Sequence, residues 1–174
     1  MSARTLPPSP LLRSIWLLPC AFALHIVEES RGFTAWVRDV LGGSIGLGAF
    51  LVNNAIFMGV LVGLCALATR TRQRWAVIAL FFWVAGQVFW NFVFHLFTEI
   101  HFGAYSPGLV TATLLYYPLY LFLVRQAVVE GWLTVRWIAA SLIAGALGLA
   151  FTIWAGLYGF GDVPLSRWLP FCAH

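Results

Sequence analysis

Five long apolar stretches constrain the fold of this sequence more strongly than any other feature. A helix that crosses a lipid bilayer needs about 20 predominantly apolar residues, and each stretch reaches or approaches that length. Because lipid offers no hydrogen-bond partners to backbone N–H and C=O groups, such stretches must be helical. The sequence therefore predicts an all-α, polytopic membrane helix bundle with five transmembrane helices, at about residues 11–29, 44–68, 75–100, 108–129 and 135–159.

The composition agrees with this interpretation and excludes several classes of protein. Charged residues make up 9% of the 174-residue chain, whereas a soluble domain carries about 25%. We expect residues 1–174 to form a single integral membrane domain. The ten basic residues are all arginines spread over the loops, so they form no patch that would bind nucleic acid. The three cysteines have neither a disulfide pattern nor metal-type spacing: Cys20, Cys65 and Cys172.

The first apolar stretch has an alternative interpretation as a secretory signal, because arginines precede it. Pro19, however, replaces the small residue expected before Cys20 in a lipoprotein cleavage site, and no other small-residue cleavage site follows. We therefore interpret this stretch as the first transmembrane helix.

The arginines are distributed unevenly between the two sides of the predicted bundle. Cytoplasmic loops of membrane proteins carry an excess of Lys and Arg. Five helices place the two ends of the chain on opposite sides, and most arginines fall on the side of the N-terminus. The sequence thus predicts an N-terminus inside and a C-terminus outside. The arginines on the inner side are Arg4, Arg13, Arg70, Arg72, Arg74, Arg125 and Arg136, and those on the outer side are Arg31, Arg38 and Arg167.

A histidine and two adjacent carboxylates stand at the end of the first predicted helix. Residues three and four apart on a helix are surface neighbours, so Glu28 and Glu29 should flank His25 on its two sides. Ionisable residues inside a membrane are costly to bury and usually mark functional sites. The segment 24–30 is therefore the leading candidate for a functional site.

The third predicted helix carries a second polar cluster. Gln87, Asn91, His95 and Glu99 recur every four residues, so they form a slowly turning line along one side of the helix. A polar line of this kind should face the bundle interior rather than lipid. Because the first and third helices both run outward, the two polar clusters should lie at the same membrane depth.

Together, the two clusters form a set of imidazole and carboxylate groups suited to zinc, iron or manganese. The predicted ligands are His25, Glu28, Glu29, His95 and Glu99, in a mononuclear or a dinuclear site. In a mononuclear site, a glutamate that does not bind the ion is left to act as a base toward a metal-bound water, so Glu28 and Glu29 are also the candidate catalytic residues. Four further polar residues should support the ligands: Asn54, Asn91, His101 and Tyr105.

These residues favour a metal-dependent membrane enzyme that acts on a lipidic or otherwise apolar substrate, by hydrolysis or by oxidation at a dimetal centre. Three alternatives remain open. The same residues could relay protons without a metal. His25 and His95 could hold a haem. The chain could also be a non-enzymatic membrane subunit or binding module, whose polar cluster only ties helices together and whose partner is another membrane protein.

The motif His25-Ile26-Val27-Glu28-Glu29, near the start of a five-helix chain, resembles the HXXEE domain family of bacterial membrane proteins. In that family, a second histidine-bearing helix precedes a turn that contains Tyr, Pro and Gly. His95 and the segment Tyr105–Thr111 are similar to that part, and the resemblance extends to about residue 125. It implies a bacterial inner membrane location and marks His25, Glu28, Glu29 and His95. The family is known chiefly by its motif, so the resemblance implies no substrate.

Overall fold

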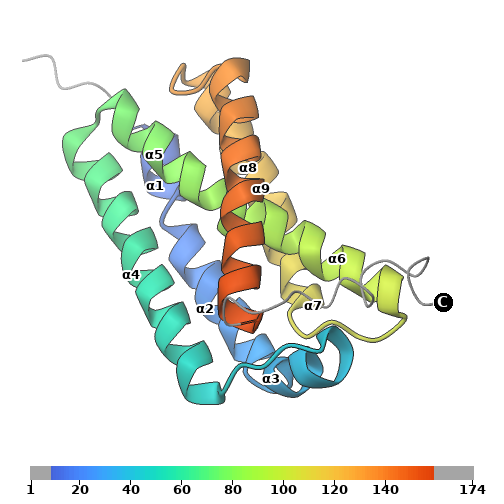
Figure 1. Cartoon of the computed structure of the whole chain (residues 1–174). Helices are drawn as coiled ribbons and strands as arrows, with labels where there is room; N and C mark the ends of the chain where they lie inside the picture. The colour runs from blue at the N-terminus through green and yellow to red at the C-terminus, as the bar shows by residue number, and fades with distance from the viewer. Residues whose placement is uncertain (1–8, 159–174) are drawn as a thin grey trace, which may run out of the picture.

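The computed structural model describes residues 9–158, and this part of the chain is helical without any strand (Figure 1). Five of its helices are long and apolar enough to cross a membrane: Pro10–Glu29, Leu47–Thr71, Arg74–Phe102, Leu109–Val129 and Val135–Tyr158. The predicted fold class is thereby confirmed, and the arrangement is consistent with an integral membrane protein. In chain order, with η for a π-helical segment, the elements are α1 (Pro10–Ser14), α2 (Leu17–Glu29), α3 (Phe33–Trp36), η1 (Val37–Leu41), α4 (Leu47–Thr71), α5 (Arg74–Val84), η2 (Ala85–Trp90), α6 (Asn91–Phe102), α7 (Leu109–Thr111), η3 (Ala112–Tyr116), α8 (Tyr117–Val129) and α9 (Val135–Tyr158).

A break divides the first membrane-spanning helix into α1 and α2. Pro19 has no backbone N–H, so it cannot donate to the carbonyl of Ile15 four residues earlier. The Ile15 carbonyl instead accepts hydrogen bonds from the backbone N–H of Leu18 at 3.1 Å and from the Cys65 thiol at 3.6 Å. The break is therefore explained by Pro19. The Cys65 thiol on α4 supplies one of the hydrogen bonds that the Ile15 carbonyl would otherwise lack.

The third membrane-spanning helix comprises α5, η2 and α6, and α9 packs across it at η2 (Figure 1). Two glycines permit this close crossing. A Cβ atom added to Gly145 would lie 2.6 Å from the backbone nitrogen of Gly86 and 2.8 Å from the carbonyl carbon of Ala85. Small residues allow helix backbones to approach in membranes, so the position of α9 depends on the absence of a side chain at residue 145.

The crossing gives a first prediction. Gly145→Ala should destabilise the protein by about 1–3 kcal/mol, because the added methyl group overlaps backbone atoms that cannot move independently. Thermal melting in detergent measures this effect. Gly148→Ala on the same helix is the matched control, since a Cβ atom there meets nothing within 4 Å. Equal melting temperatures for the two variants would contradict the crossing.

A short helical segment between the first and second spans, α3 with η1, closes one end of the bundle near α4 and α9. Its apolar residues pack with Phe50 and Leu157 in a small core. This helical segment was not predicted: residues 30–43 lie between the first two predicted helices. Its signal is helical spacing of apolar residues, at positions i, i+3, i+4, i+7 and i+8: Phe33, Trp36, Val37, Val40 and Leu41.

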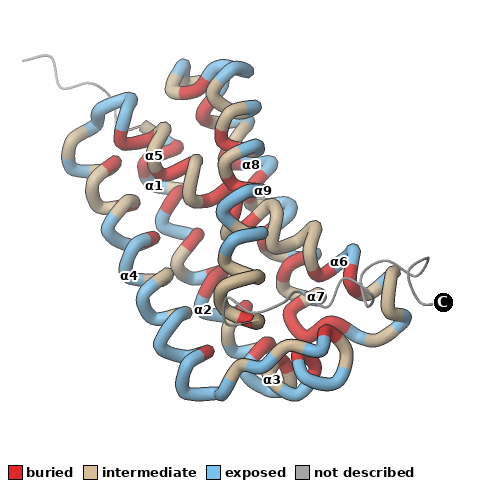
Figure 2. The backbone as a smooth tube through the Cα atoms, in the orientation of Figure 1, coloured by how far each residue is buried: buried red, intermediate tan, exposed pale blue. Residues whose placement is uncertain are grey.

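The surface of the bundle is apolar where it would meet lipid. Figure 2 shows long exposed tracts on α4 and α9, the two most exposed of the five long helices. Large apolar side chains such as Val52, Ile56, Ile143 and Leu147 lie on these tracts. A soluble protein rarely exposes so extensive an apolar surface, so these faces are suited to lipid contact.

Candidate metal centre

Three buried side chains from α2 and α6 converge at one point inside the bundle. His25 and Glu29 lie one turn apart on α2, and His95 projects from α6. Glu29 Oε1 is 3.5 Å from His25 Nε2 and 3.3 Å from His95 Nε2. One potential ligand atom from each residue lies within 4.8 Å of the others, and all three side chains are buried. We call this group the His–Glu centre.

The backbones of α2 and α6 are bridged by the segment that follows the turn, since α7 and η3 pack against both helices. Gly108, directly before α7, closes one side of the centre. A Cβ atom added there would lie 2.7 Å from His25 Cε1 and 2.8 Å from His95 Cε1. With a φ of +106°, residue 108 also adopts a backbone conformation that glycine tolerates best. Both the conformation and the space therefore require glycine.

A hydroxyl group fixes the ring of His25. Thr111 Oγ1 lies 2.8 Å from His25 Nδ1 and donates to Glu28 Oε2 at 2.6 Å. A threonine hydroxyl has a single proton. If that proton is given to Glu28, Thr111 Oγ1 must accept the Nδ1–H of His25. His25 Nε2 then carries a free lone pair directed at the centre, as a metal ligand requires.

Ser106 holds His95 in a similar way. Ser106 Oγ lies 2.9 Å from His95 Nδ1 and 3.1 Å from the hydroxyl of Thr98. The backbone N–H of Ser106 donates to Glu99 Oε2 at 2.7 Å. Within the described residues, Nε2 of both histidines is buried without a hydrogen-bond partner. Each imidazole is thus anchored through Nδ1 and leaves Nε2 available.

Glu28 has a different role from Glu29, although the two are adjacent in sequence. Its carboxylate accepts hydrogen bonds from the hydroxyl of Tyr105 at 2.5 Å and of Thr111, and from three backbone N–H groups, those of Gly108, Val110 and Thr111. Partial burial and the Glu28 carboxylate raise the pKa of Tyr105 to about 12, so its phenol remains a donor at neutral pH. Glu28 therefore anchors the segment that carries Gly108 and Thr111.

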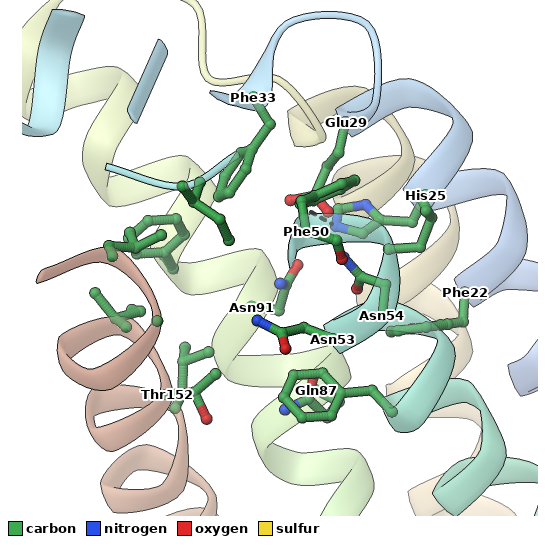
Figure 3. Close-up of a pocket in the computed structure, with 18 residues that line it drawn as sticks. Phe22, His25, Glu29, Phe33, Phe50, Asn53, Asn54, Gln87, Asn91 and Thr152 are labelled. Carbon is green, nitrogen blue, oxygen red and sulfur yellow. Dashed lines mark hydrogen bonds and ion pairs between the residues drawn. The ribbon is translucent and has the colours of Figure 1, made fainter. Parts of the chain in front are cut away.

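A cavity of about 100 Å³ adjoins the centre between α2, α4, α6 and α9 (Figure 3). His25 and Glu29 form one end of it. The rest of its wall combines aromatic and aliphatic side chains with amides from α4, η2 and α6. The cavity gives a small molecule or head group access to the Glu29 carboxylate.

The other predicted site residues lie around the centre but outside it. Glu99 binds the backbone of Ser106, and Tyr105 binds Glu28. His101 stacks on Phe97, with ring centroids 5.2 Å apart. Asn54 and Asn91 line the cavity, and neither forms a hydrogen bond with the two histidines.

Gly108, Ser106 and Thr111 were not predicted to position the two histidines. The turn Tyr105–Thr111 was recognised through the resemblance, and Tyr105 alone was predicted to support the ligands. The available signal was a dense run of Ser, Pro, Gly and Thr directly after a polar helix end, which is typical of a tight turn.

Comparison with known proteins supports the importance of this region. A family model with the description "Protein of unknown function with HXXEE motif" matches residues 16–123, which include the His–Glu centre and the segment that supports it. Neither the curated proteins nor the solved structures give a match. Because the matched region spans more than half of the chain, the protein belongs to the HXXEE-motif family.

Proposed function

We propose that this protein is a metal-dependent membrane enzyme that acts on a lipidic substrate, with one divalent ion held by His25, Glu29 and His95. One observation carries the proposal: two buried Nε2 atoms without hydrogen-bond partners converge on one carboxylate oxygen. Unpaired polar atoms are expensive inside a protein. A cation between these atoms would satisfy all of them at once.

The separation of the Glu29 oxygen from each of the two Nε2 atoms supports a first-row divalent ion. Ligands at about 2.1 Å from a tetrahedral zinc ion lie about 3.4 Å from one another. The Glu29 oxygen is 3.5 and 3.3 Å from the two Nε2 atoms. Two histidines and one carboxylate, with a position left open, are typical of catalytic zinc sites and of non-haem iron sites. Glu28 and Glu99 are engaged elsewhere, which favours a mononuclear centre.

The alternatives fit the geometry less well. Polar groups that only tie helices together normally bond one another, whereas the separations of 3.3 and 3.5 Å exceed good N–H···O distances. A haem between the two histidines would need space for a porphyrin between their rings, and the ring centroids are only 5.1 Å apart. A metal-free proton relay would use the same residues, and metal analysis separates it from our proposal.

The centre would supply the chemistry and the bundle would supply the substrate environment. A bound divalent ion activates a water molecule or polarises a carbonyl oxygen. The two histidines hold their positions because Thr111 and Ser106 fix both rings. The adjoining cavity is lined by aromatic and aliphatic side chains together with amides, which suits a substrate that enters from the bilayer with a polar group attached to an apolar chain. The distribution of arginines favours a centre in the outer half of the membrane, and the resemblance implies that this is a bacterial inner membrane.

Metal analysis of the purified protein tests the proposal. The wild type should retain one zinc, iron or manganese ion per chain in elemental analysis. His25→Ala and His95→Ala should lower the affinity by more than the roughly 10–100-fold that loss of a supporting hydrogen bond costs. A competing chelating dye measures the affinities.

His101→Ala is the control for this measurement, because His101 lies on the same helix as His95 and stacks on Phe97 outside the centre. It should leave the metal content unchanged. Wild-type protein without a stoichiometric metal after loading, or full metal retention in both histidine variants of the centre, would refute the proposal.

A further inference from the structure

Four side-chain amides gather in the cavity beside the His–Glu centre, and we call them the amide cluster: Asn53, Asn54, Gln87 and Asn91. Asn53 and Asn54 come from α4, while Gln87 and Asn91 come from η2 and the start of α6. Figure 3 shows Gln87, Asn91 and Asn53 below His25 and Glu29, with Thr152 of α9 on the opposite wall. The cluster thus occupies the part of the cavity that extends away from the centre.

The hydrogen-bonding capacity of the amide cluster is largely unused. Asn54 donates to the carbonyl of Phe50 at 3.0 Å. Asn91 Oδ1 is buried without a partner among the described residues, and neither Asn53 nor Gln87 forms a side-chain hydrogen bond within residues 9–158. Amides inside membrane proteins usually bond across helices, because an unsatisfied polar group in an apolar environment is costly. These amides face one cavity and do not bond one another.

Apart from the ion proposed for the His–Glu centre, no side chain that lines the cavity supplies a permanent positive charge to balance an anionic head group. Arginine is the only basic residue type in the chain besides histidine, and no arginine lines the cavity. Its ionisable lining residues are His25 and Glu29 of the centre. Phosphate recognition in proteins relies on Arg, Lys or helix N-termini. An uncharged ligand with oxygen atoms that donate and accept hydrogen bonds fits the amides better.

The size and position of the cavity indicate how much of such a ligand it would contain. Its volume of about 100 Å³ is smaller than the roughly 150 Å³ of a cavity that binds benzene. The cavity therefore encloses only part of a glycerol-sized head group, and the remainder lies at its open side. Asn53 is exposed and Thr152 is half-buried, so the cavity reaches the surface between α4 and α9. An acyl chain attached to the head group would extend there along the apolar faces of both helices.

We propose that the amide cluster binds the uncharged head group of a neutral glycerol ester lipid. The amide NH₂ groups donate to the ester carbonyl, and the amide oxygens accept from the glycerol hydroxyls. This arrangement brings the ester close to the His–Glu centre. The proposal names a substrate class for the proposed function and rests on that function only for the reaction, because lipid binding itself needs no metal.

Native mass spectrometry of the full chain in detergent, after removal of metals with a chelator, tests the lipid proposal. The probes are monoolein and oleoyl lysophosphatidic acid, which share the glycerol and the acyl chain and differ by the phosphate. The wild type should bind one monoolein and prefer it to the phosphate-bearing lipid. Asn53→Leu combined with Asn91→Leu should weaken monoolein binding at least about tenfold, because two hydrogen bonds are lost.

Gln126→Leu is the matched control, since this amide lies on α8 outside the cavity and its Oε1 is also buried without a partner. It should bind monoolein like the wild type. Equal or tighter binding of the phosphate-bearing lipid by the wild type would overturn the proposal without any variant. Unchanged monoolein binding in the double variant would overturn it too.

A parallel zinc titration separates this proposal from the proposed function. If zinc binds stoichiometrically and monoolein does not bind, the lipid proposal fails and the metal centre stands. If monoolein binds as expected and no metal is retained, the metal centre fails and the lipid site stands.

Discussion

Gly108→Ala is expected to abolish stoichiometric metal binding and to destabilise the protein by about 2–6 kcal/mol. The added methyl group would lie 2.7 Å from His25 Cε1 and 2.8 Å from His95 Cε1, so at least one imidazole must move away from Glu29. Overpacking of this kind costs about 1–3 kcal/mol. The φ of +106° adds backbone strain of about 1–3 kcal/mol. Elemental analysis and thermal melting in detergent measure the two effects.

Gly103→Ala is the control that separates backbone strain from steric overlap. Gly103 also has a positive φ, +61°, but a Cβ atom there meets nothing within 4 Å. This variant should lose stability only through strain and should keep its metal. If Gly108→Ala retains metal as well as Gly103→Ala does, the packing of Gly108 against both imidazoles is not essential to the centre.

Glu28→Gln should release the segment that holds His25. The carboxylate accepts from Tyr105 and from two backbone N–H groups at Oε1, and from the N–H and hydroxyl of Thr111 at Oε2. Backbone N–H groups face both carboxylate oxygens. In either orientation of its side-chain amide, a glutamine would therefore place its NH₂ group against a backbone N–H. Hydrogen bonds to a charged group contribute about 1.5–3 kcal/mol each, and we expect a loss of about 3–5 kcal/mol. Metal affinity should fall about 10–100-fold, since Thr111 no longer fixes His25.

Glu99→Gln is the comparison for this variant. Glu99 accepts one backbone hydrogen bond, from Ser106 at 2.7 Å, and a glutamine oxygen can accept it equally well. Thermal melts and chelator competition should therefore show a small effect. Similar losses of stability and metal affinity in Glu28→Gln and Glu99→Gln would contradict this expectation. They would mean that the negative charge, rather than the number of hydrogen-bond donors at Glu28, holds the segment in place.

The sequence was sufficient to predict the five long helices. It also predicted that His25 and His95 lie at the same depth in the bundle. Apolar length determines which segments cross a membrane, and the confirmed fold class follows from it. An outward direction for the first and third spans predicts that His25 and His95 reach the same depth. The structure brings these two side chains together with Glu29.

Helix spacing was insufficient to distinguish the roles of the three glutamates. Spacing defines the face of a helix on which Glu28 or Glu99 lies, but it does not reveal what packs against that face. The turn before α7 folds back and presents backbone N–H groups to both carboxylates. Its path depends on the left-handed conformation of Gly108, which is a tertiary property. The first span was predicted as one helix over residues 11–29, although Pro19 is a sequence cause for its break between α1 and α2. The π-helical segments were not predicted.

Both histidines of the centre are held by side chains of one short segment, His95 by Ser106 and His25 by Thr111. For the ion proposed at this centre, opening of the segment and release of the ion would be linked equilibria. An ion that binds the closed form stabilises it by an amount that grows with the ratio of ion concentration to dissociation constant. Reciprocally, a ligand that binds the open segment would make the binding free energy of the ion less favourable by the same amount. The turn would thus give the protein a thermodynamic link between the segment Tyr105–Thr111 and an ion bound at the proposed site among its helices.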